Sequence, residues 1–359
     1  MITKFTAENY GCLKKVAIDL TPIHAFIGPN DSGKSTLLHA IRSLVGFTSG
    51  RFVQNQGEWH PFDPWMAVKE GDSSRLLGVH TPTGWYAVEV TSEKAEERCQ
   101  AGDNRGPFTT SQRALGSSCS FLHPSHAQLL PVLSELSGAR LLRLDADALR
   151  RPSGLIPADQ LDSLGFLDDR GDGLPSVLYG LRERDHEAFR ALVETLRGFF
   201  PTIKTLRLPA ATPSTLTLEI ELADGTRVRP DRMSDGLLRF LALSTQRFLA
   251  PCSVVLVEEP ENGLHPARVA DVVHALRTFS SATNTQILMA THSPLVIDEL
   301  TPDEVTVLIR PSVEEGTRAI PIRNTRNFEN RAKTYSLGEL WLAYSDGDQE
   351  DPLFNPRLR

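Results

Sequence analysis

A short segment near the start of the chain has the residue types and spacing of a phosphate-binding loop. Gly28-Pro-Asn-Asp-Ser-Gly33-Lys34-Ser35-Thr36 fits the pattern G-x-x-x-x-G-K-[ST] without a mismatch. Glycines let the backbone wrap closely, so that successive N–H groups point at phosphates. We expect Lys34 to reach the β- and γ-phosphates of ATP and the Ser35 hydroxyl to bind Mg²⁺. The candidate nucleotide-binding residues are Gly28, Asn30, Asp31, Ser32, Gly33, Lys34, Ser35 and Thr36.

Two adjacent carboxylates, Glu258 and Glu259, follow the continuous apolar run 254–257. At the end of a buried strand they would be costly without a cation or hydrogen-bond partners. Mg²⁺ and an attacking water would supply such partners. We therefore assign Glu258 to the metal, directly or through water, and Glu259 to the general base that polarises the water.

A third motif, Thr291-His292-Ser293-Pro294, follows another apolar run, 286–290. A histidine in this position can donate to the γ-phosphate and report whether that phosphate is present. Taken alone, a structural histidine with satisfied hydrogen bonds is an equal alternative, but the order of the three motifs favours the switch role. The catalytic candidates are thus Glu259, His292 and Lys34.

The elements that must position these residues alternate between strands and helices. The phosphate-binding loop stands between an apolar strand and a helix with leucine and isoleucine at helical spacing. Such alternation around buried apolar runs predicts an α/β sheet. The expected strands are 2–9, 16–20, 24–27, 254–257, 286–290 and 305–309, and the expected helices of this part follow the loop and cover 237–249 and 266–279.

The middle of the chain, from about 47 to 208, has a less regular pattern. We expect a hairpin from 76–80 and 85–90 around Pro82-Thr-Gly84, and an exposed polar loop over 99–120. Residues 174–199 alternate at helical spacing and predict one or two amphipathic helices. No heptad pattern is sustained, so we expect no long coiled-coil arm. A second hairpin is expected from 216–222 and 226–229 around Asp224-Gly225.

Composition is that of an ordinary globular protein, with 40% hydrophobic and 23% charged residues. No apolar run approaches the roughly 20 residues that span a bilayer, and the first residues lack a signal-peptide core, so we expect a cytoplasmic protein without membrane contact. A net charge of −7 does not attract nucleic acid over the whole molecule, although a basic strip lies at 310–333. The four cysteines are far apart, which argues against a zinc site or a disulfide framework.

The order of these motifs resembles the ATP-binding-cassette clan, specifically its soluble branch of SMC, RecF and OLD-type ATPase domains. In that family a short signature, commonly L-S-G-G-Q, opens a helix and completes the site of the opposite subunit. Met233-Ser234-Asp235-Gly236 resembles this signature in reduced form. The resemblance implies that Ser234, Asp235 and Gly236 contact the γ-phosphate of ATP held by the other protomer. By spacing alone Ser234 is a helix N-cap, and the two roles are compatible.

Other phrases fit the same branch. Glu261-Asn-Gly-Leu-His-Pro266 occupies the place of the family's D-loop, and the form E-E-P-E-N-x-L-H-P is similar to the OLD/RecF-like ATPases and unlike most transporters. The sequence segments 8–13 and 336–341 also resemble this branch. Asp31, however, stands where the family frequently has glycine. The family's glutamine loop has three candidates, Gln54, Gln56 and Gln112, and Tyr10 either stacks on adenine or packs under the sheet.

The resemblance implies a P-loop NTPase fold of the ABC type, with a mixed sheet, flanking helices, antiparallel N-terminal strands and a helical insertion. We expect a single ATPase head over 1–359, with a lobe from 1–47 and 205–335, an insertion over about 48–204 and a short tail, 336–359.

The resemblance also implies a function. The head would bind ATP and Mg²⁺, form a homodimer around two ATP molecules and release it on hydrolysis. It would act as a conformational switch in DNA repair or phage defence, with a separate protein effector and with DNA as a further candidate partner.

Two alternatives have different requirements. The ATP-binding subunit of an ABC transporter would need a full signature and a coupling segment, and neither is evident. An OLD-like nuclease would need a TOPRIM domain, but only about fifty residues follow Ile309. Asp346-Gly-Asp348 imitates the D-x-D pair of that domain within what reads as an acidic loop.

Overall fold

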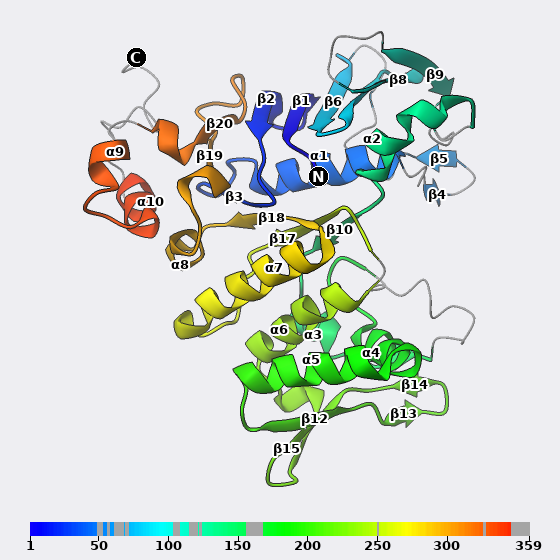
Figure 1. The fold of residues 1–359 in the computed structure, drawn as a ribbon, viewed down its shortest axis with the longest axis vertical. Helices are drawn as coiled ribbons and strands as arrows, with labels where there is room; N and C mark the ends of the chain where they lie inside the picture. The colour runs from blue at the N-terminus through cyan, green and yellow to red at the C-terminus, as the bar shows by residue number, and fades with distance from the viewer. Residues whose placement is uncertain are drawn as a thin grey trace. The chain divides into compact units, whose positions relative to one another are not determined.

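The computed structural model divides the chain into two compact units. The first comprises Met1–Leu141, Cys252–Val257 and Asn284–Arg359, and the second Leu142–Pro251 and Glu258–Thr283. Figure 1 shows the elements of both units. The structure describes residues 1–48, 53–55, 58–60, 68, 72–102, 108–114, 121, 124–155, 168–249, 251–325 and 328–345.

An antiparallel sheet of the first unit has the strand order β2-β1-β6-β7-β8-β9. Side chains alternate along β7 between buried and half-buried, as expected for a sheet with one face on a core. The strands are β1 (Lys4–Tyr10), β2 (Leu13–Asp19), β6 (Arg75–Thr81), β7 (Gly84–Val90), β8 (Lys94–Ala101) and β9 (Thr109–Ala114).

A second sheet of this unit has the order β10-β17-β18-β3-β19-β20. Its central strand β3 (Ile23–Ile27) runs parallel to both neighbours and is buried throughout, which accounts for its apolar sequence. The other strands are β10 (Ala139–Leu142), β17 (Val254–Glu258), β18 (Gln286–Thr291), β19 (Val305–Ile309) and the antiparallel β20 (Arg318–Pro321). A separate hairpin pairs β4 (Val53–Asn55) with β5 (Glu58–His60).

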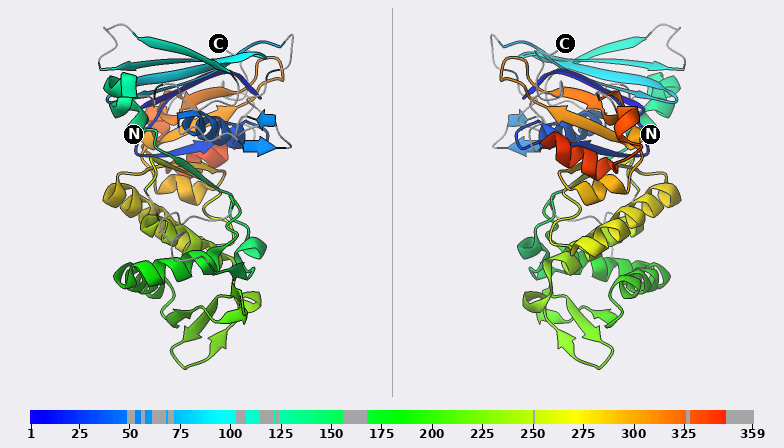
Figure 2. Two further views of the ribbon diagram at one scale, coloured as in Figure 1. Left: turned by 90° about the vertical axis from the view of Figure 1, so that its right-hand side faces the viewer. Right: turned by 90° about the vertical axis from the view of Figure 1, so that its left-hand side faces the viewer.

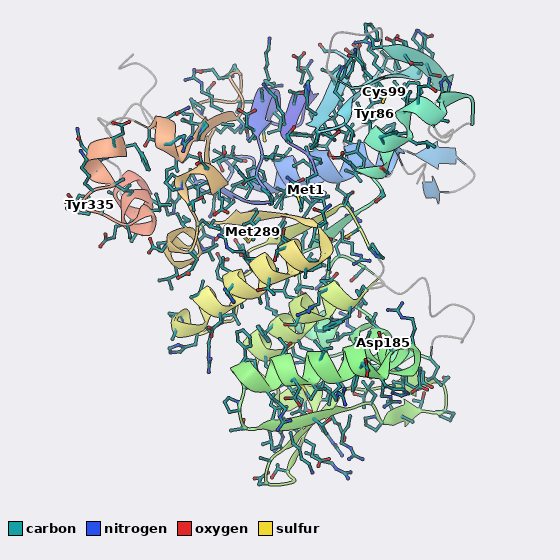
Figure 3. The ribbon with its side chains drawn as sticks, in the orientation of Figure 1. Met1, Tyr86, Cys99, Asp185, Met289 and Tyr335 are labelled. Atoms are coloured by element: carbon teal, nitrogen blue, oxygen red, sulfur yellow. The ribbon has the colours of Figure 1, made fainter. Side chains whose placement is uncertain are left out.

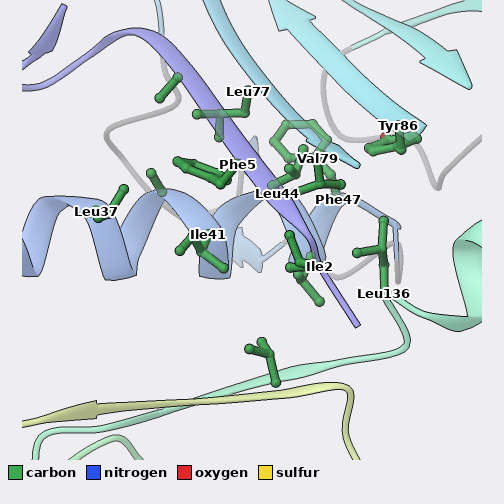
Figure 4. Close-up of a cluster of buried hydrophobic side chains, with 14 of the residues drawn as sticks. Ile2, Phe5, Leu37, Ile41, Leu44, Phe47, Leu77, Val79, Tyr86 and Leu136 are labelled. Atoms are coloured by element: carbon green, nitrogen blue, oxygen red, sulfur yellow. The ribbon is translucent and has the colours of Figure 1, made fainter. Parts of the chain in front are cut away.

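Helix α1 (Lys34–Thr48) contacts strands of both sheets. Its residues Leu37, Ile41 and Leu44 are fully buried in one cluster with side chains of β1 and β6, as Figure 4 shows. Both views of Figure 2 show this helix (blue) beside the antiparallel sheet. The helix that starts at the expected phosphate-binding loop is therefore anchored along its length by the core, and each fully buried leucine contributes about 1.5–3 kcal/mol.

Shorter helices complete the first unit. They are η3 (Pro124–Leu129), α2 (Leu130–Ser134), α8 (Pro294–Asp298), η8 (Pro302–Glu304), η9 (Ile322–Asn324), α9 (Phe328–Arg331) and α10 (Leu337–Ser345).

Helices dominate the second unit. Phe240 lies between two aromatic rings, with its centroid 4.0 Å from that of Phe199 and 5.8 Å from that of Phe200. The junction of the first two long helices is Asp185, whose side chain caps the second by accepting from the Ala188 N–H (Figure 3). The helices are α3 (Ala146–Leu149), α4 (Leu174–Arg184), α5 (His186–Phe199), η5 (Pro230–Arg232), α6 (Asp235–Thr245), η6 (Gln246–Phe248), η7 (Pro266–Arg268) and α7 (Val269–Thr283).

Two small three-stranded sheets belong to the same unit, in the orders β11-β14-β13 and β12-β15-β16. Their strands are β11 (Ser153–Gly154), β12 (Ile203–Arg207), β13 (Ala210–Thr212), β14 (Thr215–Leu216), β15 (Glu219–Leu222) and β16 (Arg227–Val228).

Two sequence expectations differ from the structure. The segment expected as a polar loop, 99–120, contains the end of β8 and all of β9, because these polar residues pair with each other and extend the sheet. The expected division into a lobe, 1–47 and 205–335, and an insertion over about 48–204 also differs, because Leu142–Pro251 and Glu258–Thr283 form the second unit. Strands β6 to β9 belong to the sheet of β1, and the chain enters the second unit only after Leu141. None of the helices in the described part of the chain is both long and apolar enough to cross a membrane.

Candidate nucleotide-binding site

The loop from Gly28 to Gly33 joins β3 to α1 and has no room for side chains at its two ends. A Cβ on Gly28 would lie 2.2 Å from the Leu308 carbonyl oxygen. Gly33 has φ +100°, and a Cβ there would lie 2.4 Å from Thr317 Oγ1 and 2.9 Å from Cys12 Sγ. Glycine is therefore required at both positions, by close approach at the first and by the left-handed backbone at the second.

The far side of this loop is held by residues distant in the sequence. Thr317 Oγ1 donates to the Ser32 carbonyl oxygen at 2.9 Å, and the Thr317 N–H donates to the Cys12 carbonyl oxygen at 2.8 Å. The Ser32 hydroxyl is buried, with no hydrogen-bond partner among the described residues. A buried polar atom of this kind needs an explanation, and a ligand that reaches the loop would supply one.

Lys34, the first residue of α1, turns back over the loop. Its Nζ donates to the carbonyl oxygens of Gly28 at 2.7 Å and Pro29 at 2.9 Å. The first turn of α1 holds no acidic residue, so nothing there offsets the positive end of the helix dipole. Ser35 is exposed and Thr36 half-buried. An ammonium group, a helix N-terminus and glycine backbone are the groups from which anion sites are built.

The strand that leads into the loop is stabilised by a buried histidine. His24 Nδ1 lies 2.9 Å from Thr21 Oγ1, and Nε2 lies 2.9 Å from Thr306 Oγ1. Burial lowers the pKa of His24 to about 4, so the ring is neutral at neutral pH. No sequence motif marks this residue.

Asp31 has an arginine partner that no sequence motif marks. Arg310 Nη1 donates to both carboxylate oxygens of Asp31, each at 3.0 Å. Asp31 has φ +64°, in the left-handed region that favours glycine. Asn30, the neighbouring residue of the loop, is exposed.

His292 lies at the same sheet edge as the loop. Thr291 at the end of β18 pairs with Ile27 at the end of the parallel strand β3, so Gly28 and His292 each follow a paired residue. The His292 side chain is exposed, and its carbonyl oxygen accepts from Trp341 Nε1 at 3.1 Å. The structure therefore brings the first and third motifs together, as the sequence predicts for carboxyl ends of parallel strands.

Glu258 ends β17 and belongs with the second unit. Its Oε2 lies 2.9 Å from Arg143 Nε, and its side chain is 15% exposed. Its Oε1 is buried and has no hydrogen-bond partner among the described residues. An incompletely satisfied buried carboxylate fits the expected role of a cation ligand. Arg143, directly after β10, carries no signal in the sequence that would have identified it.

Glu259 has φ +48°, a strained conformation for a residue other than glycine. Asn262 Nδ2 donates to Glu259 Oε2 at 2.5 Å, and the Asn262 N–H donates to the Glu259 carbonyl oxygen at 3.0 Å. The turn expected as the D-loop thus orients the expected general base. Strained backbone of this kind is concentrated at functional sites.

The segment expected as the signature opens α6. Ser234 Oγ accepts from the Leu237 N–H at 3.4 Å, which confirms the N-cap geometry. A Cβ on Gly236 would lie 2.4 Å from the Gly263 carbonyl oxygen, so this loop and the D-loop turn are in contact within the second unit. Gly236 must therefore be glycine for packing reasons alone.

Arg150 holds the same loop from the other side. It donates to the Pro230 carbonyl oxygen at 3.1 Å, to the Met233 carbonyl oxygen at 2.9 Å and to Asp235 Oδ1 at 2.5 Å. This arginine fixes the backbone immediately before α6. It was not recognised in the sequence, because its partners lie about 80 residues away.

Tyr10 is fully buried, with its hydroxyl 3.3 Å from Ser43 Oγ, so it packs under the sheet and does not stack on adenine. Gln112 lies on β9 and donates to Glu96. The side chain of Gln54 and all of Gln56 lie outside the described residues, as does Asp346-Gly-Asp348. In the basic strip, Arg318 and Arg323 are paired with Glu315 and Asp303.

Comparisons with known proteins identify families for most of this chain. Residues 118–298 match the family described as "AAA domain, putative AbiEii toxin, Type IV TA system", and residues 1–66 match the "AAA ATPase domain". The OLD nuclease of Thermus scotoductus is 23% identical over 328 residues, which cover 83% of this chain and 60% of that protein. The chain thus spans less than two thirds of this relative's length.

A solved structure shows the same fold. The chain in "Crystal structure of the SmcHead bound to the C-winged helix domain of ScpA" matches with a TM-score of 0.57 and 15% identity, over 89% of this chain and 97% of that one. The expected fold class, an α/β P-loop ATPase head, is confirmed.

Proposed function

Because the chain belongs to the AAA-domain family that residues 118–298 match, and is an ATPase domain of the ABC/SMC-like type, we propose that it binds and hydrolyses ATP with Mg²⁺. The observation that carries this proposal is the loop between β3 and α1. Its end glycines admit no side chain, and Lys34 lies over its carbonyl groups at the N-terminus of a firmly packed helix. These groups have the charge and geometry to bind a polyphosphate.

We assign the following roles in ATP binding and hydrolysis to residues of this chain. Lys34 would hold the β- and γ-phosphates. The Ser35 hydroxyl and the Glu258 carboxylate are the proposed Mg²⁺ ligands, and the metal would offset phosphate charge. Glu259, held by Asn262, accepts the proton of the attacking water. His292, next to the loop at the sheet edge, donates to the γ-phosphate. Hydroxyl and carboxylate oxygens, as Ser35 and Glu258 offer, are the kind of ligand that Mg²⁺ prefers.

ATP binding is tested by thermal melting. ATP with Mg²⁺ at about 100 times its dissociation constant should stabilise the protein by about 2.7 kcal/mol. Lys34→Ala should lose this effect, whereas Lys204→Ala, which removes an exposed lysine of the second unit, should keep it. An ATP-dependent shift that persists unchanged in Lys34→Ala would refute the assignment of the loop.

Hydrolysis is tested separately with Glu259→Gln, which keeps the shape of the side chain but cannot accept a proton. This variant should bind ATP and lose steady-state turnover. Wild-type turnover in Glu259→Gln would move the general base elsewhere, with Glu258→Gln as the next variant to measure.

We also propose that two heads close around two ATP molecules, with Ser234, Asp235 and Gly236 of each completing the site of the other. Supporting this, Arg150 and Gly263 hold the loop before α6 in a fixed shape. Closed two-fold symmetry would create two equivalent sites. ATP should then drive dimerisation of Glu259→Gln, measured by sedimentation. Ser234→Arg should block dimerisation and leave monomer binding intact.

Complementation sharpens this test. A mixture of Lys34→Ala and Ser234→Arg protomers should regain some turnover, because in a mixed dimer both lesions fall in the same site. A Glu259→Gln protein that stays monomeric at saturating ATP would contradict the shared site.

The similarity to the OLD nuclease, which is itself a longer protein, supports a proposal for the biological role. We propose that the head is a conformational switch in DNA repair or phage defence, working with a separate protein effector and with DNA as a candidate cargo. Co-purification from native cells, with Glu259→Gln used to trap the ATP state, tests this role. Recovery of neither a protein partner nor DNA would argue against it.

A further inference from the structure

The phosphate-binding loop contains a charge that opposes its proposed ligand. Asp31 is the single acidic residue between Gly28 and Thr36. We propose that Arg310 is a positioning residue of this site, which neutralises Asp31 and fixes the shape of the loop so that a polyphosphate can bind. This inference rests on the proposed ATP binding and names a residue that controls it.

The geometry identifies Arg310 as the fixed partner of the pair. Arg310 directly follows β19, which pairs in parallel with β3, the strand that leads into the loop. Its side chain is only 21% exposed, whereas that of Asp31 is 84% exposed. Both carboxylate oxygens of Asp31 accept from one nitrogen, Arg310 Nη1, at 3.0 Å each. The arginine is thus anchored at the sheet and the acid is held by it.

The backbone explains why holding is needed. Asp31 has φ +64°, a conformation that glycine adopts readily and other residues rarely do. Without Arg310, Asp31 would favour a backbone conformation at negative φ, which residues other than glycine adopt more often, and the loop would change shape. Arg310 therefore acts on loop shape as well as on charge.

A pocket of about 280 Å³ borders the ion pair. Its lining includes Asp31 and Arg310 together with Thr36 of the first turn of α1 and Lys14 of β2. The pair thus borders open space beside the expected phosphate site. The two positive charges of Lys14 and Arg310 exceed the one negative charge of Asp31 at this pocket. Removal of Arg310 would leave one positive and one negative charge there. Arg310 Nε is also buried and has no acceptor among the described residues.

The Asp31–Arg310 pair should matter for ligand binding and not for folding. A pair with a purely structural role would show the reverse. Because Asp31 is exposed, the pair contributes little to folding stability, so its loss should hardly change thermal melting. Loss of the pair should weaken polyphosphate binding more than it lowers folding stability, because a polyphosphate carries several negative charges. This effect on binding should become smaller as the salt concentration rises.

The test is a double-mutant cycle with a fluorescent ATP analogue and Mg²⁺ as the probe. Arg310→Ala should weaken binding about fivefold or more at low salt, and less at high salt. Asp31→Gly removes the acid that opposes the polyphosphate and suits the positive φ, so it should bind more tightly than wild type at low salt. The double variant should bind within about twofold of Asp31→Gly, because Arg310 then has no acid to neutralise. Arg323→Ala, which breaks an exposed pair with Asp303 in the same unit, is the matched control and should bind as wild type.

Two results would overturn the inference. One is an equal loss in Arg310→Ala with and without Asp31, which would mean that Arg310 acts independently of the acid. The other is no loss in Arg310→Ala. Failure of the wild-type protein to bind the probe would instead refute the proposed ATP binding, so the two failures are distinguishable.

Discussion

Replacing Arg143 by alanine should destabilise the protein, because the change leaves the Glu258 carboxylate without its cation. Arg143 Nε lies 2.9 Å from Glu258 Oε2, while Glu258 Oε1 is already buried without a donor among the described residues. Breaking a buried pair costs about 3–5 kcal/mol, whereas an exposed pair is worth about 0–1 kcal/mol. Glu258 is 15% exposed and Arg143 50%, so the expected loss lies between these limits, at about 1–2 kcal/mol.

Urea unfolding of four proteins measures this loss: wild type, Arg143→Ala, Glu258→Gln and the double variant. The double variant should lose less than the sum of the single losses, because the neutral amide does not need the arginine. Arg190→Ala, which breaks a more exposed pair with Glu187 in the same unit, is the matched control and should cost under about 0.5 kcal/mol. Wild-type stability in Arg143→Ala, or strictly additive losses, would refute the reasoning.

The same variant tests the metal assignment. If Glu258 binds Mg²⁺, a bound cation replaces the charge that Arg143 supplies. ATP with Mg²⁺ should then stabilise Arg143→Ala more than it stabilises the wild type. An equal or smaller gain would mean that Glu258 does not bind the metal.

Three further changes have defined outcomes. Gly33→Ala should cost about 2–4 kcal/mol in urea unfolding and abolish ATP binding, whereas Gly102→Ala, also at positive φ but with no atom within 4 Å of its Cβ, should cost about 1 kcal/mol. Arg150→Ala should reduce ATP-driven dimerisation without reducing monomer binding. Arg151→Ala, which breaks a pair with the half-buried Asp172, should change neither. The pKa of His24 is about 4 in the folded protein, against an ordinary value of 6.5. As the pH falls, the unfolded state therefore takes up a proton before the folded state does. The free energy of unfolding should decrease by roughly 3 kcal/mol between about pH 6.5 and pH 4. His24→Asn should flatten this dependence in urea titrations at pH 7 and 4.5.

The loop itself could be predicted because its requirements are local. Glycine, lysine and hydroxyl side chains at fixed spacing, between an apolar strand and an amphipathic helix, already define an anion site. The residues that hold the loop from behind could not be predicted. Thr317 and Arg310 lie 285 and 279 positions away from their partners Ser32 and Asp31, and a single sequence has no signal for such pairing.

Strand β9 shows a second limit. Its sequence, Thr-Thr-Ser-Gln-Arg-Ala, is polar and resembles a loop when read alone. It forms a strand because it pairs with the edge strand β8. Its conformation is therefore determined by pairing with a neighbouring strand and not by the local preference of its residues. Tyr10 illustrates the same point, since stacking on a ligand and packing in a core require the same aromatic residue. Only the fold, which buries Tyr10 against Ser43, distinguishes them.

One short segment links two motifs of the second unit that are far apart in the sequence. Arg143, at its start, holds the carboxylate expected to bind the metal, and Arg150, seven positions later, holds the loop expected to reach the partner's ATP. The intervening helix α3 is capped by Asp145, so the two arginines are joined by ordered backbone. A cation that replaces Arg143 at Glu258 would release one end of this segment while Arg150 still grips the other. If Glu258 binds the metal, its occupation would therefore act on the backbone before α6 through this segment, within a single chain and through residues that carry no recognisable motif.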